Sequence, residues 1–197
     1  SGHKRFISNA TVFGMMTLFA RTGEGNRGVC AFLVEPGNPG VRVVGQTPLS
    51  PHPLGEVFFE EARLPADALL GQEGQGFKIA LGTLDVFRTT VGAAALGMGQ
   101  RAHDEAVAHV KSRRQFGAPL ADLQGVQFML ADSEVELEAA RLLVWSAAWS
   151  KDGGARVGRE AASAKLVATE NAQRVIDRSL QLHGGLTRPE RGRILRQ

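Results

Sequence analysis

The chain has 197 residues, of which 43% are hydrophobic and 22% are charged, a composition that can bury a core and excludes a disordered or fibrous protein. Its 23 basic and 20 acidic residues are interleaved, with a net charge of +3, and no basic tract contains aromatic residues, so we expect no nucleic-acid partner. The single cysteine, Cys30, excludes an intrachain disulfide, and its place in the apolar run VCAFLV predicts a buried thiol in a reducing compartment.

Cellular location is predicted from two signals that the sequence lacks. The first residues, SGHKRFISNA, contain no charged stretch followed by an apolar one, as a secretory leader would. No uninterrupted apolar run approaches the ~20 residues that a membrane span requires. We therefore expect a cytoplasmic protein that does not bind membranes.

Residues up to about 65 carry the signals of strands joined by tight turns. Short apolar runs alternate with clusters of Gly, Pro and Asn, a pattern typical of hairpins. We expect a partial antiparallel β-domain over residues 1–70, as a sheet or β-roll, and a helical domain over residues 71–197. The runs are MMTLFART, VCAFLVE, VRVVGQT and EVFFEEARLP, with GEGNRG and PGNPG between them.

The junction LPADALLGQEGQGF contains three glycines, Gly71, Gly74 and Gly76, at a spacing that partly matches a dinucleotide-binding loop. A proline-containing loop precedes these glycines where the dinucleotide motif needs a strand, and the wider spacing does not fit. We therefore expect a flexible connection into a helix N-terminus, with phosphate binding as the alternative.

From Gly76 onward the apolar residues recur every three or four positions, as they do on one face of a helix. Breaks at residues 116–119 and 151–154 are short, so three long helices should pack antiparallel in an up-and-down bundle. The short basic tail after Gly185 supplies only an incomplete fourth helix, and the predicted fold class is α+β. The apolar positions are Phe77, Leu81, Leu84, Val91, Ala95, Met98 and Ala102, then Leu123, Val126, Leu130, Leu137, Ala140 and Val144, then Ala161, Ala164, Ala168, Ala172, Val175 and Leu182.

The first predicted helix contains two unusual features. Asp85 and Arg88 lie one turn apart among apolar residues, as an ion pair or as part of a site. Gly92, Gly97 and Gly99 each weaken a helix by up to ~1 kcal/mol relative to alanine. Close approach of another backbone or of a ligand is a plausible compensation for these glycines.

Two helix boundaries also carry residues that a simple turn does not need. The third helix ends at Gln181 and the pair Gly184 and Gly185, where one glycine is sufficient for a C-cap. The break after the first helix, in SRRQFGAPLADLQGVQFMLAD, places Arg113 and Phe116 beside its glycine and proline. We expect that a ligand binds at this break.

Two generic kinds of catalytic centre are excluded. Di-iron bundles need paired Glu-x-x-His motifs, and His103, His109 and His183 lack a glutamate at that spacing, so we expect no metal site. A serine hydrolase of the α/β type needs a G-x-S-x-G elbow, which the sequence does not contain.

Taken together, these features resemble the acyl-CoA dehydrogenase family of flavoenzymes. GHKRFISNA is similar to the family pattern G-x-K-x-(W/F)-I-(T/S)-N-A, and RRQFGAPLADLQGVQFMLAD is similar to R-x-x-F-G…Q…LAD. The segments VFFEEARLPADALLGQEGQGFKIALGTLDVFR, AAWSKDGG, AASAK and QLHGG complete the resemblance. It covers nearly the whole chain, as part of the family's middle β-domain and most of its C-terminal helical domain.

The resemblance implies an FAD site and an acyl-CoA site. Phe6 and Ser8 match residues that contact the isoalloxazine ring of FAD in the family. In the family, a second group of residues contacts the pyrophosphate and adenosine end of an FAD that is held mainly by the neighbouring subunit. The resemblance therefore implies at least a homodimer, commonly a homotetramer. The residues that match this end are Arg113, Phe116, Gln124, Gln181, Gly184 and Gly185, and those that match the acyl-CoA contact are Asp85, Val86, Phe87 and Arg88.

The implied reaction is α,β-dehydrogenation of an acyl-CoA to a 2-enoyl-CoA, as in fatty acid metabolism, with electrons passed to an electron-transfer flavoprotein. A carboxylate must remove the α-proton while the β-hydride passes to the flavin. Some family members carry this base at the position of Phe87, and phenylalanine cannot act as a base. We therefore expect the base beyond Gln197, in a loop that the resemblance does not reach, and expect this chain alone to be inert.

Two alternatives share the same scaffold. The first is a catalytically inactive, truncated paralogue that serves as an oligomerisation or interaction module. The second is a relative of the acyl-CoA oxidase or nitroalkane type, which differs in the reactivity of reduced flavin toward oxygen. The segment between Gly185 and Pro189 is also about five residues shorter than the family pattern, which indicates either a deletion there or residues that this sequence does not include.

Overall fold

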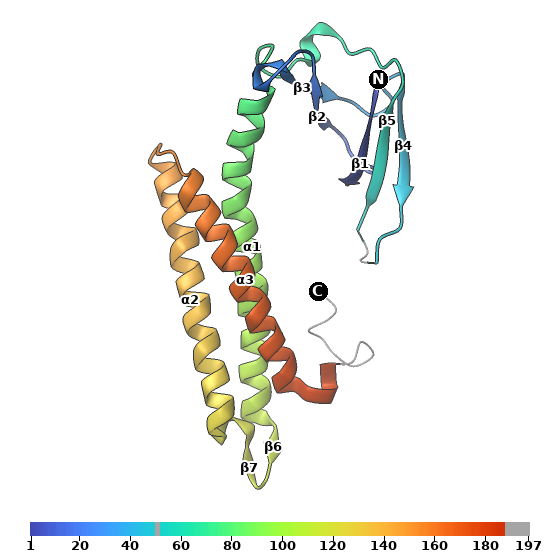
Figure 1. Cartoon of the computed structure of the whole chain (residues 1–197). Coiled ribbons are helices and arrows are strands. Elements are labelled where there is room, and N and C mark those ends of the chain that lie inside the picture. Colours follow the sequence, from blue (N-terminus) through green and yellow to red (C-terminus); the bar gives the residue numbers. More distant parts are fainter. Residues whose placement is uncertain (50–51, 188–197) are drawn as a thin grey trace. The chain divides into compact units, whose positions relative to one another are not determined.

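The computed structural model describes residues 1–49 and 52–187. The chain forms two compact units, Ser1–Gly82 and Thr83–Gln197, the first built from strands and the second from helices (Figure 1). The units divide inside the first long helix, whereas the predicted domains divide after residue 70. The reason is that the N-terminus of this helix lies against the strands: a Cβ added at Gly76 would lie 2.6 Å from the backbone carbon of Cys30.

The β unit contains two antiparallel sheets, as the alternation of apolar runs and turns predicts. One sheet has the strand order β1-β5-β4, and the other pairs β2 with β3. The strands are β1 (Gly2–Ser8), β2 (Met16–Arg21), β3 (Val29–Val34), β4 (Val41–Gln46) and β5 (Leu54–Phe59). The short 3-10 helices η1 (Asn26–Gly28) and η2 (Ala66–Ala68) lie in the connections.

The core of this unit is made by the inward-facing residues of the strands. Val34, Val57 and Phe59 are buried together with Ala10. The predicted burial of Cys30 is confirmed, and its Sγ accepts a hydrogen bond from the backbone N–H of Gly74 at 3.2 Å. The glycine-rich junction therefore packs on β3.

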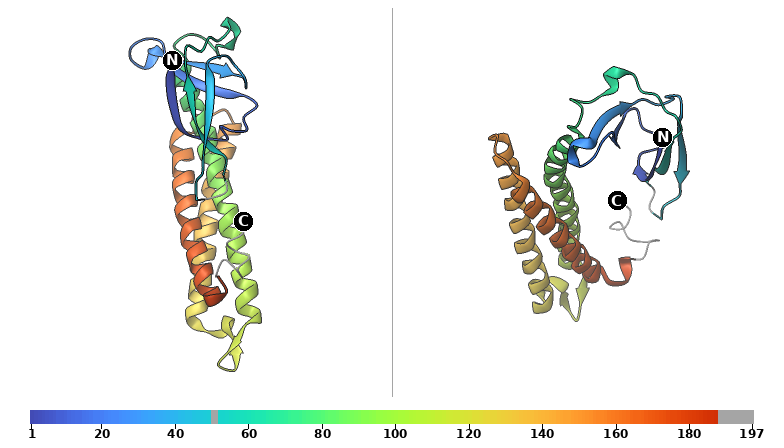
Figure 2. Two further views of the ribbon diagram at one scale, coloured as in Figure 1. Left: turned by 90° about the vertical axis from the view of Figure 1, so that its right-hand side faces the viewer. Right: turned by 45° about the horizontal axis from the view of Figure 1, so that its top comes forward.

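The helical unit contains three long helices, as predicted: α1 (Gly76–Ser112), α2 (Gln124–Asp152) and α3 (Gly158–His183). Short connections make α2 run antiparallel to α1 and α3 (Figure 2). Consequently the end of α1, the start of α2 and the end of α3 lie at the same end of the unit. Between α1 and α2 the chain forms β6 (Arg114–Gln115), β7 (Ala118–Pro119) and η3 (Leu120–Asp122), and η4 (Gly184–Thr187) follows α3.

Small residues let α1 approach α3 closely. A Cβ added at Gly92 would lie 3.3 Å from the carbonyl oxygen of Ala164, and one added at Gly99 would lie 3.2 Å from the Cα of Ala172. These two glycines therefore compensate their low helix propensity by helix packing, one of the two explanations considered above. Gly97 faces open space.

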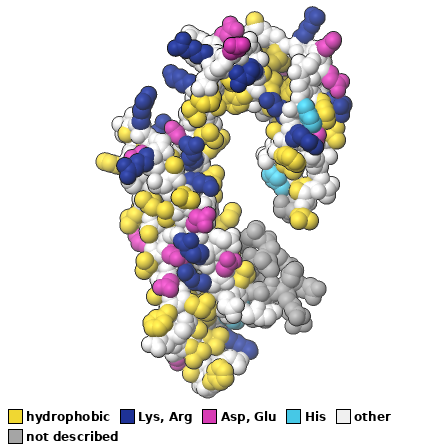
Figure 3. All heavy atoms as spheres, in the orientation of Figure 1, with side chains coloured by type: hydrophobic (Ala, Val, Ile, Leu, Met, Phe, Trp, Pro, Cys, Tyr) yellow, Lys and Arg dark blue, Asp and Glu magenta, His cyan; other side chains and the backbone are white. Residues whose placement is uncertain are grey.

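The predicted apolar face of α1 is mostly exposed within this chain. Ala102 is buried, whereas Phe77, Leu81, Leu84, Val91 and Met98 are exposed. Figure 3 shows hydrophobic side chains at the surface along the helices. The periodicity predicted the helix correctly, but the cover for this face does not come from the described residues of the chain.

The same helix bears on the expectation that no segment is apolar enough for a membrane span. By length and composition only, α1 meets those requirements, with a mean hydropathy of 1.3 over 18 residues. The expectation considered only uninterrupted apolar runs, whereas α1 reaches this average with small and polar residues among the apolar ones. A single helix of this kind is weak evidence for a membrane protein.

Candidate functional site

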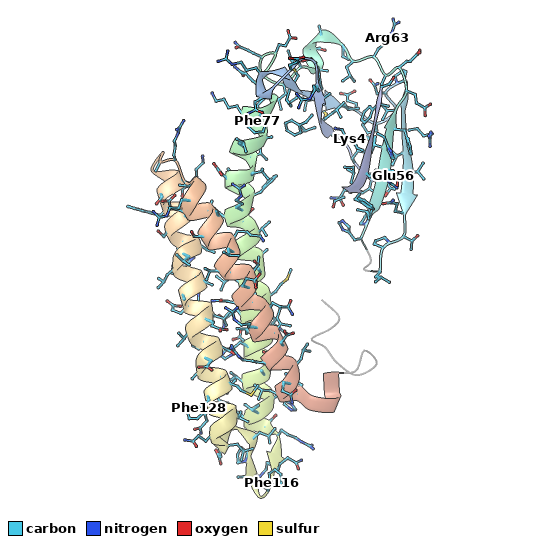
Figure 4. All side chains as sticks on the ribbon, viewed as in Figure 1. Lys4, Glu56, Arg63, Phe77, Phe116 and Phe128 are labelled. Atoms are coloured by element: carbon cyan, nitrogen blue, oxygen red, sulfur yellow. The ribbon has the colours of Figure 1, made fainter. Side chains whose placement is uncertain are left out.

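The break after α1 contains a β-hairpin with a two-residue loop. We call residues 113–117 of this break the arginine turn. Gln115 pairs with Ala118 across the hairpin, and the loop residues Phe116 and Gly117 have φ of 54° and 85°. Positive φ at both loop residues is the requirement of a type I′ turn, which Asn-Gly satisfies with little strain and a phenylalanine does not. The Phe116 ring is 92% exposed at the tip of this hairpin (Figure 4). An aromatic residue that is both strained and exposed indicates a functional position.

The arginine turn also presents an unpaired cation. The guanidinium of Arg113 is exposed and has no hydrogen-bond or ion-pair partner among the described residues, while its backbone N–H donates to the carbonyl oxygen of His109 at 2.8 Å. Arg114 donates instead to the carbonyl oxygen of Gly117 at 3.0 Å and so supports the hairpin. Gln124, the first residue of α2, is exposed nearby in sequence. An exposed guanidinium and an exposed aromatic ring on one short turn are suited to a phosphate joined to a planar base.

The end of α3, which we call the glycine turn (residues 181–185), lies at the same end of the unit. Gly184 has a φ of 56°, and its N–H caps the helix by donating to the carbonyl oxygens of Leu180 and Gln181. The C-cap reading of Gly184 is therefore correct, and it leaves Gly185 without a capping role. Gln181, Gly184 and Gly185 are all exposed.

Stacked histidines connect the two turns. His109, four residues before Arg113, stacks on His183, the last residue of α3, with ring centroids 4.5 Å apart and an interplanar angle of 20°. Sequence reasoning considered these histidines only as metal ligands and did not predict that they meet. The structure thus brings most of the residues predicted for the adenosine end of a cofactor to one end of the helical unit.

The predicted substrate segment lies elsewhere on α1. Asp85 accepts a hydrogen bond from Arg88 at 2.9 Å, which confirms the ion pair suggested by their spacing. Both side chains are about one-third exposed, while Val86 and Phe87 are more exposed. The segment therefore offers an apolar surface beside a partly neutralised charge pair.

The residues predicted to contact the flavin ring lie in the β unit. The register between β1 and β5 shifts between Lys4 and Ile7, and Phe6 within this bulge has a φ of 56° and an exposed side chain. Bulges re-aim side chains and are common beside active sites. Ser8 has a partner that the sequence did not reveal, because its Oγ lies 3.0 Å from Nε2 of His52.

Within the helical unit the predicted residues form two separate groups. Arg88 and Arg113 are separated by roughly 37 Å along the helix, at about 1.5 Å per residue. The arginine and glycine turns of one chain are therefore well separated from its own Asp85–Arg88 segment.

Sequence comparison supports one family. Residues 74–195 match the family described as "Acyl-CoA dehydrogenase, C-terminal domain". The chain is 43% identical over 190 residues to the acryloyl-CoA reductase (NADH) of Anaerotignum propionicum, covering 94% of this chain and 48% of that protein. It is 40% identical over 191 residues to the human mitochondrial short-chain specific acyl-CoA dehydrogenase, covering 94% of this chain and 46% of that protein. The chain thus spans about half the length of these relatives.

Solved structures agree with the sequence. Butyryl-CoA dehydrogenase from Megasphaera elsdenii superposes with a TM-score of 0.93 at 39% identity, over 98% of this chain and 52% of that one. The FAD complex of PigA gives a TM-score of 0.93 at 30% identity, over 99% and 52%. A chain from the structure titled for the electron transferring flavoprotein of Acidaminococcus fermentans gives 0.89 at 39% identity, over 93% and 50%. With more than half of its residues matched by the family profile and the fold shared, the chain belongs to the acyl-CoA dehydrogenase family.

Proposed function

We propose that this chain is the part of an FAD-dependent acyl-CoA dehydrogenase that binds the adenosine end of FAD and one wall of the acyl-CoA site. The observation that carries the proposal is the arginine turn, which presents an exposed guanidinium at Arg113 and, three residues later, a strained and exposed phenylalanine at Phe116. Family membership explains why a helical connection should carry such residues.

The residues of the two turns fit the chemistry of FAD. Arg113 can pair with the pyrophosphate through two parallel N–H donors, and the ring of Phe116 offers a face for adenine. Gln124 and Gln181 supply amide donors and acceptors, and Gly185 lets the ligand approach the backbone closely. When bound, FAD accepts the hydride that leaves the substrate.

A homo-oligomer follows from the separation along α1. Because one chain holds its two groups roughly 37 Å apart, each complete site combines the turns of one copy with the substrate segment of another. This arrangement supports a homodimer at least, as the resemblance implies, and is compatible with a homotetramer.

The surface of α2 supports the same conclusion. Phe128, Val135, Leu142 and Trp149 are exposed at intervals of seven residues, with Trp145 between the last two. We call these five residues the α2 stripe. Exposed apolar residues at a seven-residue repeat are typical of a helix that packs against another helix. A second copy of the chain is the partner that a shared site requires.

The substrate assignment rests on Asp85, Val86, Phe87 and Arg88. The exposed side chains of Val86 and Phe87 suit an acyl chain, and Arg88 with Asp85 suits the polar thioester and pantetheine end. The names of the relatives favour a short acyl chain. Phe87 cannot remove a proton, so the base remains predicted beyond Gln197.

Two further elements of the proposal come from the relatives. An electron-transfer flavoprotein is the proposed electron acceptor, because a solved relative at 39% identity carries that protein in its title. Reduction of an enoyl-CoA is a second candidate activity, favoured by 43% identity to a protein named acryloyl-CoA reductase. Turnover assays distinguish the two, since dehydrogenation of acyl-CoA needs an electron acceptor that reoxidises the flavin, whereas reduction of enoyl-CoA needs a donor such as NADH that reduces it.

The proposal is tested by FAD binding to the purified chain and to its Arg113→Ala variant. Loss of one charge-assisted contact to phosphate should weaken binding by about 1.5–3 kcal/mol and leave the circular dichroism spectrum unchanged. Arg156→Ala is the matched control, because Arg156 is an exposed arginine just before α3, at the opposite end of the helical unit. Equal FAD affinity of all three proteins contradicts the assignment of Arg113. Complete absence of FAD binding favours the non-catalytic interaction module.

A further inference from the structure

The stacked pair His109 and His183 has no role in the function proposed above, yet it joins the end of α1, which leads into the arginine turn, to the glycine turn at the end of α3. His109 lies on the last full turn of α1, and its carbonyl oxygen accepts the backbone N–H of Arg113. His183 lies at the end of α3, directly before Gly184, and its Nδ1 lies 2.7 Å from the carbonyl oxygen of Ser179. Each ring is thus tied to one turn by the backbone of its own helix.

The stack is a direct side-chain contact between the ends of α1 and α3. Gly184 and Gly185 carry no side chains, and the side chain of Arg113 is exposed. A change in the separation of the rings therefore changes the separation of the arginine turn and the glycine turn.

The surroundings of the His109 ring favour its neutral form. The pKa of His109 lies below its usual value of 6.5, first because the ring is partly buried, and then because of His183 from α3 and Arg113 from the end of α1. The charged or chargeable groups that act on His109 are thus all cationic. Two protonated rings with centroids 4.5 Å apart beside a permanent guanidinium repel one another.

We propose that His109 and His183 act as a proton-sensitive clasp, which holds the arginine and glycine turns at the spacing that the cofactor needs while the rings are neutral and releases them when both are charged. The residues are positioning residues, since neither needs to touch the cofactor. The proposal rests on the proposed FAD site for its functional meaning. The clasp itself is a property of the helical unit and has a test of its own.

The direction of the pH dependence follows from the lowered pKa. A histidine whose pKa is lower in the folded chain binds fewer protons there than in the opened form. The clasp is therefore fully closed above the usual pKa of 6.5, and it loosens as the pH falls through 6.5 and the lowered value. FAD affinity should weaken in the same range.

The test compares wild type with the double variant His109→Phe and His183→Phe, which keeps two stacked rings that cannot be charged. The single variant His109→Phe keeps His183 stacked on a ring that cannot be charged, and it serves if the double variant fails to fold. His103→Gln is the matched control, because His103 also lies on α1 but contacts Glu134 of α2 and neither turn.

The first measurement needs no cofactor. Hydrogen exchange of the Arg113 and Gly184 amides gives their protection factors at about pH 7.5 and about pH 5.5, on either side of the usual histidine pKa. Wild type and His103→Gln should lose protection at these amides on acidification by about fivefold or more, the factor expected for two unit charges at this separation in water. Both phenylalanine variants should keep it.

The second measurement is the dissociation constant of FAD at the same two pH values. Wild type should weaken on acidification on the order of five- to tenfold more than the double phenylalanine variant. Equal pH dependence of amide protection in wild type and variants overturns the clasp, whatever the FAD result. Absence of FAD binding at both pH values, with protection that depends on pH only in wild type and His103→Gln, overturns the proposed cofactor site and leaves the clasp standing.

Discussion

Phe116 is a residue that lowers the stability of the isolated chain but is suited to bind a ligand. Its left-handed backbone and exposed ring both raise the free energy of the isolated chain, because non-glycine residues at positive φ are strained and apolar rings favour burial. A residue that only closed the hairpin would be Asn, the preferred partner of glycine in a type I′ turn. The preference for phenylalanine therefore points to an interaction outside the chain.

Replacing Phe116 by Asn should separate the two effects. We expect the chain to gain about 1 kcal/mol in its free energy of unfolding, because Asn tolerates the left-handed region. FAD affinity should fall by about 1–3 kcal/mol, the usual contribution of an aromatic ring stacked on a base. Urea denaturation and FAD titration of the same sample measure both quantities. A variant that loses both stability and affinity would show that the ring supports the hairpin itself.

His103 is a buried polar residue with an incomplete set of partners. Its Nε2 lies 3.3 Å from a carboxylate oxygen of Glu134, whereas its Nδ1 has no hydrogen-bond partner among the described residues. We expect His103→Leu to raise the free energy of unfolding by about 1 kcal/mol, because it removes a buried unsatisfied atom and keeps the side-chain volume similar. Thermal denaturation of this variant beside His103→Gln, which stays polar, measures the effect. A lower melting temperature for His103→Leu would mean that the contact with Glu134 outweighs the orphaned nitrogen.

At the scale of elements, α2 and α3 are joined by alanines and by one charged cluster. Ala140, Ala147, Ala164 and Ala168 form the buried contact. Beside it, Glu136 accepts hydrogen bonds from Arg178 at 2.6 and 3.2 Å and from Arg174 at 3.1 Å. These bonds fix the register of α2 against α3. The small buried alanines interlock only weakly, so without these bonds one helix could slide along the other.

The charged cluster predicts a loss of stability in acid. Hydrogen bonds from Arg178 above all, and from Arg174, hold the pKa of Glu136 below its usual 4.5. A lowered carboxylate pKa contributes stability above pH 4.5 that is lost as the pH falls through the lowered value. Glu136→Gln should therefore cost about 1 kcal/mol near pH 7, after allowance for solvent screening, and progressively less as the pH falls below 4.5. Urea denaturation across this range tests it, and a cost that does not change with pH would assign the effect to packing.

The elements were largely predictable from sequence, because strands and helices differ in the period of their apolar residues and both breaks contain glycine. The hairpin β6–β7 was not predicted, since strands of two residues have no period and Phe-Gly lacks the usual turn signature. The exposure of Phe77, Leu81 and Met98 was not predicted either. Periodicity identifies an apolar face but does not specify whether the same chain covers it.

The site was predicted from a resemblance, and most of its residues remain predictions. Geometry adds what local pattern cannot, namely which ends of helices meet. His109 and His183 are far apart in sequence and carry no motif in common, so only the three-dimensional packing reveals their stack. The contact of His52 with Ser8 was not predicted, because these residues are also far apart in sequence.

At the scale of the whole molecule, the proposed sharing of a site between two copies predicts complementation between chains that carry different substitutions. A chain with Arg113→Ala and a chain with Asp85→Ala lack opposite halves of the site. In a symmetric dimer assembled from equal amounts of both, about a quarter of the sites should receive two intact halves. Flavin bleaching by acyl-CoA in the mixture, beside its absence in either variant alone, would measure this in the parent enzyme that contains the base. No recovery after dissociation and remixing would contradict sharing between copies.

The position of the tryptophans on the α2 stripe gives the chain an optical property. The sequence contains two tryptophans and no tyrosine, and Trp145 and Trp149 are 62% and 79% exposed. Intrinsic fluorescence excited near 295 nm, where indole is the main absorber among the side chains, therefore reports on one face of one helix. Emission should be red-shifted and readily quenched by iodide while this face is exposed to water. It should move to shorter wavelength when another helix covers the face. Dissociation of an oligomer on dilution can therefore be followed by the emission wavelength of an unlabelled sample.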